Sequence, residues 1–386
     1  MNIAFEKPTL WQRARPVFTG FDGPLFIAVL ALAAAGLITM YSAGFDHGTR
    51  FSGHARNMLL GLGVLFIVAQ VPPQQLMRLA VPLYALGVTL LIVTALLGIT
   101  KKGATRWLDV GLVIQPSEIL KIAVPLMLAW WFQRREGQAR ASDFLVALAL
   151  LALPVGLILR QPDLGTAILV LSAGLYVIFF AGLPWRLIVP LLLLAAVGVV
   201  SVVMFSDALC QPGVDWPLLR AYQKNRVCTL LDPGSDPLGK GFHIIQGMIA
   251  IGSGGLDGKG FMKGTQTHLE FIPERTTDFI FAAFGEEFGL LGCVGLLAAF
   301  SLLILRGLMI AADAPTVFTR LLAGAITLSF FTYAFVNMGM VSGILPVVGV
   351  PLPFVSYGGT AMVSLGLGLG ILMSIAKSRR LMQSLN

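Results

Sequence analysis

The sequence predicts an all-α polytopic membrane protein, with about ten transmembrane helices and one large extracytoplasmic loop that carries short amphipathic helices. Of its 386 residues, 56% are hydrophobic and only 12% are charged, whereas a soluble domain carries about 25% charged residues. The mean hydropathy of +0.85 excludes an ordinary soluble enzyme. We expect a single membrane domain over residues 1–386, because the one long loop has no core of its own.

Ten apolar runs are long enough to cross a bilayer, which takes about 17–25 residues. They cover residues 24–42, 57–71, 79–99, 117–132, 143–159, 164–182, 186–205, 279–305, 319–340 and 358–376. The second run is short, so its boundaries are the least defined. The start of the chain is polar and basic, and no cleavage pattern follows the first run, so we expect that run to remain as a span.

Basic residues favour an orientation with both termini in the cytoplasm. The segments that this orientation places inside hold thirteen lysines and arginines, and the short outside loops hold six. The long loop is not counted, because long segments translocate regardless of charge. Lys101, Lys102 and Arg106 run against the rule. We interpret them as cations with another task, and we expect their neutralisation to lower activity without affecting insertion.

The long loop covers about residues 206–277. Residues 217–231 have the pattern of a short amphipathic helix, which the turn Asp232-Pro233-Gly234 ends. Residues 243–252 are apolar but too short to span, so we expect them to lie at the interface or to re-enter the membrane. We interpret the glycine-rich stretch 252–260 either as a loop that surrounds a ligand and binds it through backbone amides, or as a flexible series of turns.

The composition of the loop limits its chemistry. A disulfide between Cys210 and Cys228 is permitted outside the cytoplasm, but we favour two free thiols. Before Asp278 the loop carries seven basic and seven acidic residues. It is therefore no general basic field, which argues against nucleic acid as a partner.

Ionisable residues at membrane depth are costly and indicate function by default. Residues 115–121 open the fourth span, and Glu118 and Lys121 are three apart, on one face of the helix. They form either a self-contained ion pair or a phosphate-binding lysine that its glutamate orients. The Ser-x-x-x-Lys spacing excludes the serine nucleophile of Ser-x-x-Lys acyl enzymes.

Two aspartates lie where spans begin. Asp163 precedes the sixth span, where an anion is favoured and where a simple helix cap is the alternative. Asp278 is the last polar residue before the eighth span. Desolvation there raises the pKa of a carboxylate and makes it a better proton acceptor near neutral pH; capping is again the alternative. Glu286 and Glu287 lie about 12 Å deeper, where Lys121 or other cations are possible partners.

Residues 349–359 contain two prolines, Ser356 and paired glycines. They form either a rigid loop with free backbone amides, which contacts a polar headgroup, or a plain turn. Carboxylates and cations thus converge on the outer membrane face. This suits an amphiphilic anionic substrate such as a lipid-linked pyrophosphate, because cations stabilise the leaving group and a carboxylate activates a hydroxyl.

Six motifs closely resemble the SEDS family: residues 103–109, 115–121, 161–166, 226–233, 269–281 and 353–359. The resemblance runs from the first span to the last, and residues 268–275 are similar to the elongation-type rather than the division-type members. It implies a ten-span fold in the bacterial cytoplasmic membrane. It also implies an inverting peptidoglycan glycosyltransferase that polymerises lipid II and releases undecaprenyl pyrophosphate during cell elongation.

The resemblance implies roles for single residues. Asp278 matches the family's essential aspartate, the candidate general base. Substrate binding is expected of Glu118, Lys121 and Asp163 in the central cavity, of Arg106, Trp107 and Arg226 in outer-face motifs, and of Ser356. The resemblance makes no cofactor certain and leaves a divalent cation, Mg²⁺ or Mn²⁺, open, with Glu118, Asp163 and Asp278 as its candidate ligands.

Lipid II, membrane lipid and a class B penicillin-binding protein, which is a transpeptidase, are the partners that the resemblance implies. Two rival functions use the same features. A flippase for lipid-linked cell-wall precursors would use the same cavity and cations without bond chemistry. A scaffold for the cell-wall machinery would not need the buried carboxylates and lysine.

Overall fold

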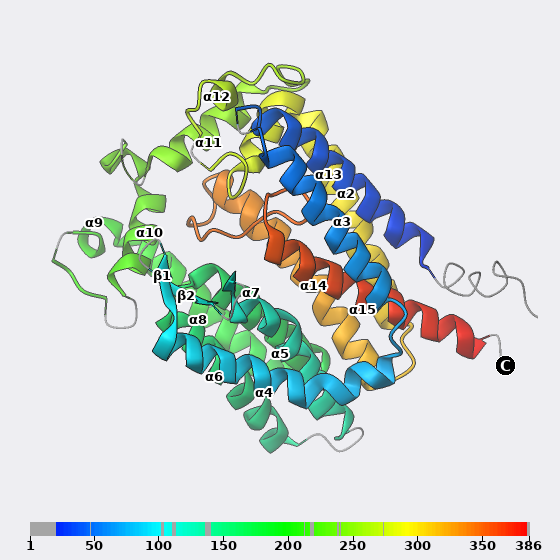
Figure 1. Cartoon of the computed structure of the whole chain (residues 1–386). Helices are drawn as coiled ribbons and strands as arrows, with labels where there is room; N and C mark the ends of the chain where they lie inside the picture. The colour runs from blue at the N-terminus through cyan, green and yellow to red at the C-terminus, as the bar shows by residue number, and fades with distance from the viewer. Residues whose placement is uncertain are drawn as a thin grey trace, which may run out of the picture.

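The protein is a bundle of long helices with a cluster of short elements at one end (Figure 1). The structure, a computed structural model, describes residues 21–46, 48–101, 104–109, 113–135, 140–211, 213–216, 220–237, 239, 241–272 and 274–383. The predicted all-α polytopic architecture is confirmed. The basic N-terminal residues used to orient the chain lie outside the described ranges.

Each predicted span forms a helix. The long helices are α2 (Gly23–Ala43), α3 (Arg50–Val68), α4 (Pro73–Leu97), α5 (Pro116–Gln133), α6 (Ala141–Arg160), α7 (Leu164–Phe180), α8 (Trp185–Met204), α13 (Ile280–Ala312), α14 (Val317–Val341) and α15 (Gly359–Gln383). Within the described residues, eight of them are long and apolar enough to cross a membrane. The other two are α7, which has 17 residues, and α5, which carries Glu118 and Lys121. Both pack inside the bundle against α14 and each other.

The second span begins seven residues earlier than expected. Its first two turns carry Arg50, His54 and Arg56, which the apolar run excluded. Of these, His54 is fully buried in the protein interior, whereas Arg56 is exposed. Hydropathy alone therefore placed the start of α3 too late.

A small antiparallel sheet, which was not predicted, follows α4. It consists of β1 (Ile99–Lys101), β2 (Ala104–Asp109) and β3 (Val113–Ile114) in that order. Thr100 faces Thr105 across the first pair, and their hydroxyls lie 2.8 Å apart. The sheet leads the chain directly into α5 and holds Arg106 at the bundle end.

Small residues bring the helices of the bundle close together, as the Gly366-Leu-Gly-Leu-Gly370 run predicts. A Cβ on Gly366 would lie 2.2 Å from the Gly61 carbonyl of α3. A Cβ on Gly36 of α2 would lie 2.1 Å from the Phe354 carbonyl. These contacts fix α15 against α3, and the loop before α15 against α2.

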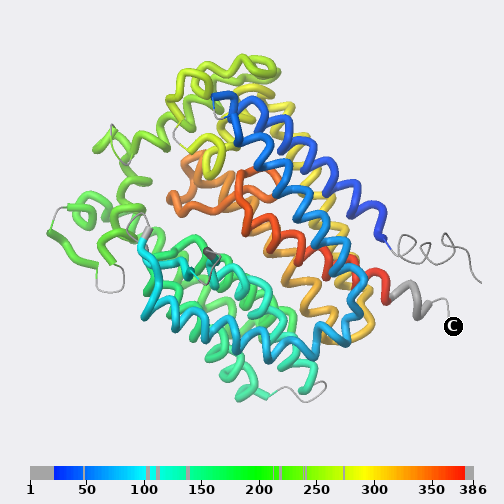
Figure 2. The backbone as a smooth tube through the Cα atoms, viewed as in Figure 1, coloured from blue at the N-terminus to red at the C-terminus, as the bar shows by residue number. Residues whose placement is uncertain are grey.

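The loop end of the bundle is the end that carries residues 205–279. Its elements are α9 (Ser206–Leu209), α10 (Ala221–Leu231), η1 (Pro233–Ser235), α11 (Phe242–Ser253) and α12 (Thr265–His268). Figure 2 shows them gathered at one end, while both ends of the described chain lie at the other. The expected short helix and its stop at residues 232–234 are confirmed as α10 and η1. The apolar residues 243–252 lie in α11, and their position at the interface or as a re-entrant segment stays a prediction.

Cys210 and Cys228 are joined by a disulfide, so the expectation of two free thiols was wrong. The fold brings the end of α9 beside α10, 18 residues further along the chain. Sequence spacing alone carried no information on that contact. The bond ties α10 to the chain that leaves α8.

Candidate active site

Asp163 is the centre of a polar cluster at the loop end. Its carboxylate caps α7, because Oδ1 accepts a hydrogen bond from the Thr166 amide at 3.2 Å. Oδ2 accepts from Nε2 of Gln115 at 3.0 Å, just before α5 begins. The capping interpretation is therefore confirmed. The Asp163 carboxylate also interacts with a cation in addition to capping the helix.

That cation is Arg106 on β2. Its Nη1 lies 3.7 Å from Oδ1 of Asp163, and its Nη2 donates to the Pro162 carbonyl at 3.0 Å. The sheet thus brings Arg106 to the turn between α6 and α7. Of the other two residues in the basic cluster, Lys102 lies outside the described residues, as does the side chain of Lys101. Trp107 is half-buried and pairs with Ile99 in the sheet; substrate binding by its ring stays a prediction.

Arg226 approaches the same cluster from α10. Its Nη1 donates to the Val347 carbonyl in the loop between α14 and α15. Burial lowers the pKa of this guanidinium, and the charge of Arg106 lowers it too, whereas Tyr222, Asp278 and Asp163 oppose that change. Arg226 therefore lies within electrostatic range of both aspartates, and it connects the Asp163 cluster to Asp278.

Asp278 is half-buried in the tight turn that precedes α13. Nδ2 of Asn337 donates to its carbonyl at 3.0 Å and to the Val350 carbonyl at 2.7 Å. Gly349 has φ +75° and passes so close that a Cβ there would lie 3.2 Å from Oδ2 of Asp278. Glycine is favoured at this conformation. The loop of residues 342–358 therefore forms a wall beside the carboxylate.

Ser356 fixes that wall to the turn. Its Oγ donates to the Thr277 carbonyl at 2.7 Å and accepts from the Leu352 amide at 2.8 Å. The Tyr357 amide donates to the Thr276 carbonyl at 2.8 Å. The Ser356 hydroxyl thus already donates its hydrogen bond to another group of the protein. The structure places Ser356 as a positioning residue next to Asp278; direct contact with substrate stays a prediction.

Glu118 and Lys121 form a separate pair on α5. Their Oε1 and Nζ atoms lie 2.6 Å apart, and Oγ of Ser364 donates to Oε2 of Glu118 at 3.0 Å. Nζ of Lys121 lies 5.3 Å from the centre of the Tyr333 ring. A cavity of about 30 Å³ beside them is lined by Lys121, Tyr333 and Ser364, among others. The predicted contact between Glu118 and Lys121 is confirmed. Both interpretations include this contact, so phosphate binding by Lys121 stays a prediction.

The three carboxylates considered as metal ligands do not fit a shared divalent cation. Both oxygens of Asp163 accept hydrogen bonds within the protein, and those of Glu118 are engaged by Lys121 and Ser364. Among the described residues, no three histidine, cysteine or acidic side chains come together as metal ligands.

Two residues of the site were missed in the sequence. Gln115 and Asn337 hold Asp163 and Asp278 respectively. Asn337 is a polar residue, 0% exposed, inside the apolar run of α14. That property indicates function in a membrane helix and was a usable signal. Gln115 gave none, because its contact depends on the tertiary approach of α7.

The glycine-rich stretch pairs with a break in α13, and ligand binding by its backbone amides stays a prediction. Gly289 has φ +63°, which interrupts the helix. The amides of Lys259 and Gly260 donate to the carbonyls of Glu286 and Glu287, both at 3.0 Å. Backbone groups released by the break are therefore satisfied by the loop, as buried backbone groups must be.

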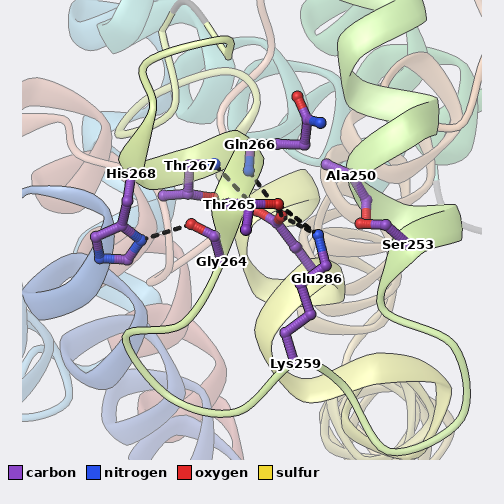
Figure 3. A network of polar contacts seen from close by, with 9 residues as sticks. All are labelled: Ala250, Ser253, Lys259, Gly264, Thr265, Gln266, Thr267, His268 and Glu286. Atoms are coloured by element: carbon purple, nitrogen blue, oxygen red, sulfur yellow. Dashed lines mark hydrogen bonds and ion pairs between the residues drawn. The ribbon is translucent and has the colours of Figure 1, made fainter.

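Glu286 holds this loop with its side chain (Figure 3). The carboxylate is 0% exposed and accepts from Nζ of Lys259 at 2.8 Å, and from the amides of Gln266 and Thr267 at 2.8 and 3.0 Å. Oε1 of Glu287 accepts from the Ser42 hydroxyl. Lys259, and not Lys121, is thus the cation that pairs with Glu286.

The geometry therefore supports one composite site at the loop end. Arg106, Asp163, Arg226 and Asp278 come together from β2, the start of α7, α10 and the turn before α13. Arg106 next to Asp163 and Arg226 near Asp278 can bind an anionic group, and the half-buried Asp278 can accept a proton from a neighbouring hydroxyl.

Relatives with known names share the whole chain. A family model described as "Cell cycle protein", for FtsW, RodA and SpoVE, matches residues 24–381. The chain is 47% identical over 378 residues to peptidoglycan glycosyltransferase MrdB of Escherichia coli (strain K12), which covers 98% of each chain. It is 35% identical over 365 residues to a probable peptidoglycan glycosyltransferase FtsW of Synechocystis, covering 92% of this chain and 88% of that one.

Solved structures show the same fold. A chain of a peptidoglycan synthase complex, described for its coordination of polymerization and crosslinking, matches with a TM-score of 0.76 and 32% identity, covering 93% of this chain and 98% of that one. The rod shape determining protein RodA of Thermus thermophilus matches with a TM-score of 0.68 and 29% identity, covering 94% and 98%. The chain therefore belongs to the SEDS family of FtsW- and RodA-type cell cycle proteins.

Proposed function

We propose that this chain is a peptidoglycan glycosyltransferase of the elongation type, which polymerises lipid II with Asp278 as the general base. The observation that carries the proposal is the position of Asp278: its carboxylate is half-buried beside Gly349 and within electrostatic range of Arg226. Its relatives named peptidoglycan glycosyltransferase support the same activity over nearly the whole chain.

The chemistry is a displacement at the anomeric carbon of one lipid II. The 4-hydroxyl of the acceptor sugar attacks that carbon, and Asp278 accepts the hydroxyl proton. The bond from the carbon to the phosphate oxygen breaks, and undecaprenyl pyrophosphate leaves with the electron pair. Attack opposite the leaving group inverts the configuration. Arg226 and Arg106 stabilise the negative charge that develops on the pyrophosphate.

A requirement of polymerisation for a divalent cation stays a separate prediction. It does not rest on Glu118, Asp163 and Asp278, because these carboxylates do not fit a shared ion. Polymerisation after chelation tests it. If chelation abolishes activity and Mg²⁺ or Mn²⁺ restores it, we assign the ion to the substrate pyrophosphate rather than to these three carboxylates.

We also propose that the loop end faces outward from the bacterial cytoplasmic membrane, with both termini in the cytoplasm. The distribution of basic residues supports this orientation. The partner proposed is a class B penicillin-binding protein, because a neighbour in fold belongs to a complex that coordinates polymerization and crosslinking. Such a partner would crosslink the strands that this chain makes.

The activity is tested with purified protein in detergent, with its partner's transpeptidase blocked and labelled lipid II as substrate. No bilayer is present, so a flippase has nothing to flip across. We expect glycan strands from the wild type and none from Asp278→Asn. Asp257→Asn, which changes an exposed aspartate of the same loop, is the matched control and should polymerise normally.

Two outcomes decide against the proposal. Absence of strands, together with translocation in vesicles that depends on Lys121, would identify a flippase. Normal rod growth of cells that carry only the Asp278→Asn protein would identify a scaffold, because a scaffold does not need the carboxylate.

A further inference from the structure

A cavity of about 650 Å³ lies at the loop end, beneath α10. It is partly open, and its walls are one face of α10, the turn after η1, the start of α11 and Val347 of the loop before α15. Figure 1 shows α10 and α11 on the side of the bundle where that loop emerges. The volume falls within the range of about 300–1,000 Å³ that is usual for small-molecule sites. None of the predicted site residues except Arg226 lines it.

Helix α10 turns a polar face to this cavity. Tyr222, Asn225, Arg226 and Thr229 line it, and their spacing of three and four residues places them on one side of the helix. Another face of α10 is tied down: Nζ of Lys224 donates to the carbonyls of Gln211 and Val214, at 2.8 and 2.6 Å. The disulfide of Cys228 adds a covalent tie there. The helix is thus held so that the polar face borders the empty space.

The Tyr222 hydroxyl is buried and has no hydrogen-bond partner among the described residues. A buried polar group without a partner costs free energy, so nearly all such groups in native proteins find one. Tyr222 is one of the residues that line a cavity large enough for a ligand. A ligand with hydrogen-bonding groups that enters the cavity is the candidate partner for this hydroxyl.

The rest of the lining favours a neutral ligand. Arg226 and Asp236 carry opposite charges, and Asn225 and Thr229 are neutral. His243 adds an imidazole, whose pKa is lowered by burial. Ile244 and Val347 supply apolar surface. Hydroxyl and amide groups with small apolar contacts match a hydroxylated ring that carries an acetamido group, whereas a pyrophosphate requires an excess of cations.

The cavity shares a wall with the proposed catalytic carboxylate. Arg226 binds the Val347 carbonyl, and Gly349, two residues further on, passes beside Oδ2 of Asp278. On the other side, the His243 ring lies 5.6 Å from the ring of Phe279, the residue after Asp278. Asp278 itself does not line the cavity; a ligand there contacts Arg226 and Val347, which connect the cavity to the chain beside Asp278.

We propose that this cavity is a sugar subsite, which binds N-acetylated hexose rings of the substrate next to the reacting bond. The proposal rests on the glycosyltransferase activity inferred above and assigns the neutral glycan to a place apart from the pyrophosphate. Tyr222, Asn225 and Thr229 donate and accept hydrogen bonds with the sugar. Arg226 lies at the junction, where the glycan meets the charged leaving group.

The test compares two ligands that share the lipid and the pyrophosphate but differ in the sugar. Binding of labelled lipid II and of undecaprenyl pyrophosphate is measured with the purified protein carrying Asp278→Asn, so that no turnover occurs. In the Asp278→Asn protein, Tyr222→Phe should weaken lipid II binding about three- to tenfold, because one hydrogen bond to the sugar is lost. Binding of undecaprenyl pyrophosphate should not change.

Tyr41→Phe is the matched control. This tyrosine is about half exposed on α2 and stacks on Phe261, away from the cavity. Its loss of a hydroxyl should change neither affinity. Tyr222→Phe should also leave the thermal midpoint equal or higher, because it removes a hydroxyl that has no partner. Asn225→Ala, at an exposed position, gives a second variant with the same expected selectivity.

A lipid-free tetrasaccharide of N-acetylated rings identifies which sugar is bound. If it competes with lipid II in a Tyr222-dependent way, the cavity takes the acceptor glycan; if only intact lipid II responds to Tyr222→Phe, it takes the donor sugar. The sugar subsite is overturned if Tyr222→Phe and Asn225→Ala leave lipid II binding unchanged, or weaken both lipids equally. Because binding is measured without turnover, this result is independent of whether the chain polymerises.

Discussion

At the scale of single residues, the site is built by pairing charges whose partners come from distant segments. Asp163 serves as a helix cap and as the partner of Arg106, so one side chain shapes the backbone and the electrostatic field. Arg226 remains charged near Asp278 although burial lowers its pKa, because an arginine pKa starts far above neutral. The site thus keeps a fixed positive charge beside a titratable carboxylate.

His243 gives a prediction on the pH dependence of stability. Burial lowers the pKa of this imidazole from its usual 6.5, and Glu274 only partly opposes the change. Between the folded-state pKa and 6.5 the unfolded chain binds more protons, so stability is complete above about pH 6.5 and falls as the pH drops towards the folded-state pKa. We expect His243→Gln to flatten this acid-side loss, measured as the thermal midpoint in detergent from pH 7.5 to 5.5. An unchanged pH dependence would assign the loss to other groups.

At the scale of elements, α13 owes its shape to a loop that inserts at its break. The segment 255–260 pairs with residues 286–291, and a Cβ on Gly289 would lie 2.3 Å from the Gly258 amide. Glu286 then fixes the following segment through its buried carboxylate. The first part of α13, which begins two residues after Asp278, is therefore fixed to the loop at residues 286–291.

Gly289→Ala tests this arrangement. The substitution forces a side chain into a positive-φ position and against the Gly258 backbone, so we expect a loss of at least about 1–3 kcal/mol in unfolding free energy, measured as a lower thermal midpoint. Gly295→Ala is the control, because it lies in the same helix with open space around its Cα. It should be neutral or stabilising by up to about 1 kcal/mol. Equal effects of the two substitutions would show that the break is not held by these contacts.

The disulfide links another element to the site. Cys228 lies two residues after Arg226 on α10, so the bond helps to hold that guanidinium at the Val347 carbonyl. We expect the double variant Cys210→Ser, Cys228→Ser to lose up to about 3 kcal/mol of stability and to polymerise more slowly. Reductant should slow the wild type but should not slow the double variant. The control Cys293→Ala keeps the disulfide, so reductant should slow it as much as the wild type. Wild-type activity that resists complete reduction would show that the bond does not position Arg226.

At the scale of the whole molecule, hydropathy and local spacing predicted the helices, the short elements of the loop and the Glu118–Lys121 pair, because these depend on neighbours along the chain. The break at Gly289 was missed, since a glycine in an apolar helix is as easily explained by close packing. The disulfide and the Asn337–Asp278 contact, which joins residues 59 apart, depend on tertiary approach. The polar Asn337 in an apolar run signals function, but its position in the sequence does not identify Asp278 as its partner, and cysteine spacing does not identify the disulfide.

Orientation in the membrane is also a property of the whole molecule. Ser235 in η1 and Ala312 at the end of α13 are both exposed and lie at opposite ends of the bundle. In intact cells, we expect a membrane-impermeant thiol reagent to label Ser235→Cys but not Ala312→Cys. The reverse pattern would place the site in the cytoplasm, where a partner transpeptidase outside the membrane could not receive its product.

The most direct measurement of the central claim is the pH–rate profile of polymerisation for the wild type, Asp278→Glu and Asp278→Asn. If Asp278 is the general base, Asp278→Asn should lose at least about 100-fold in rate. Asp278→Glu should retain measurable activity with its acid limb displaced along the pH axis, because the group that must be deprotonated has changed. An Asp278→Glu profile with an unmoved acid limb, or an Asp278→Asn enzyme of near wild-type rate, would show that another group accepts the proton.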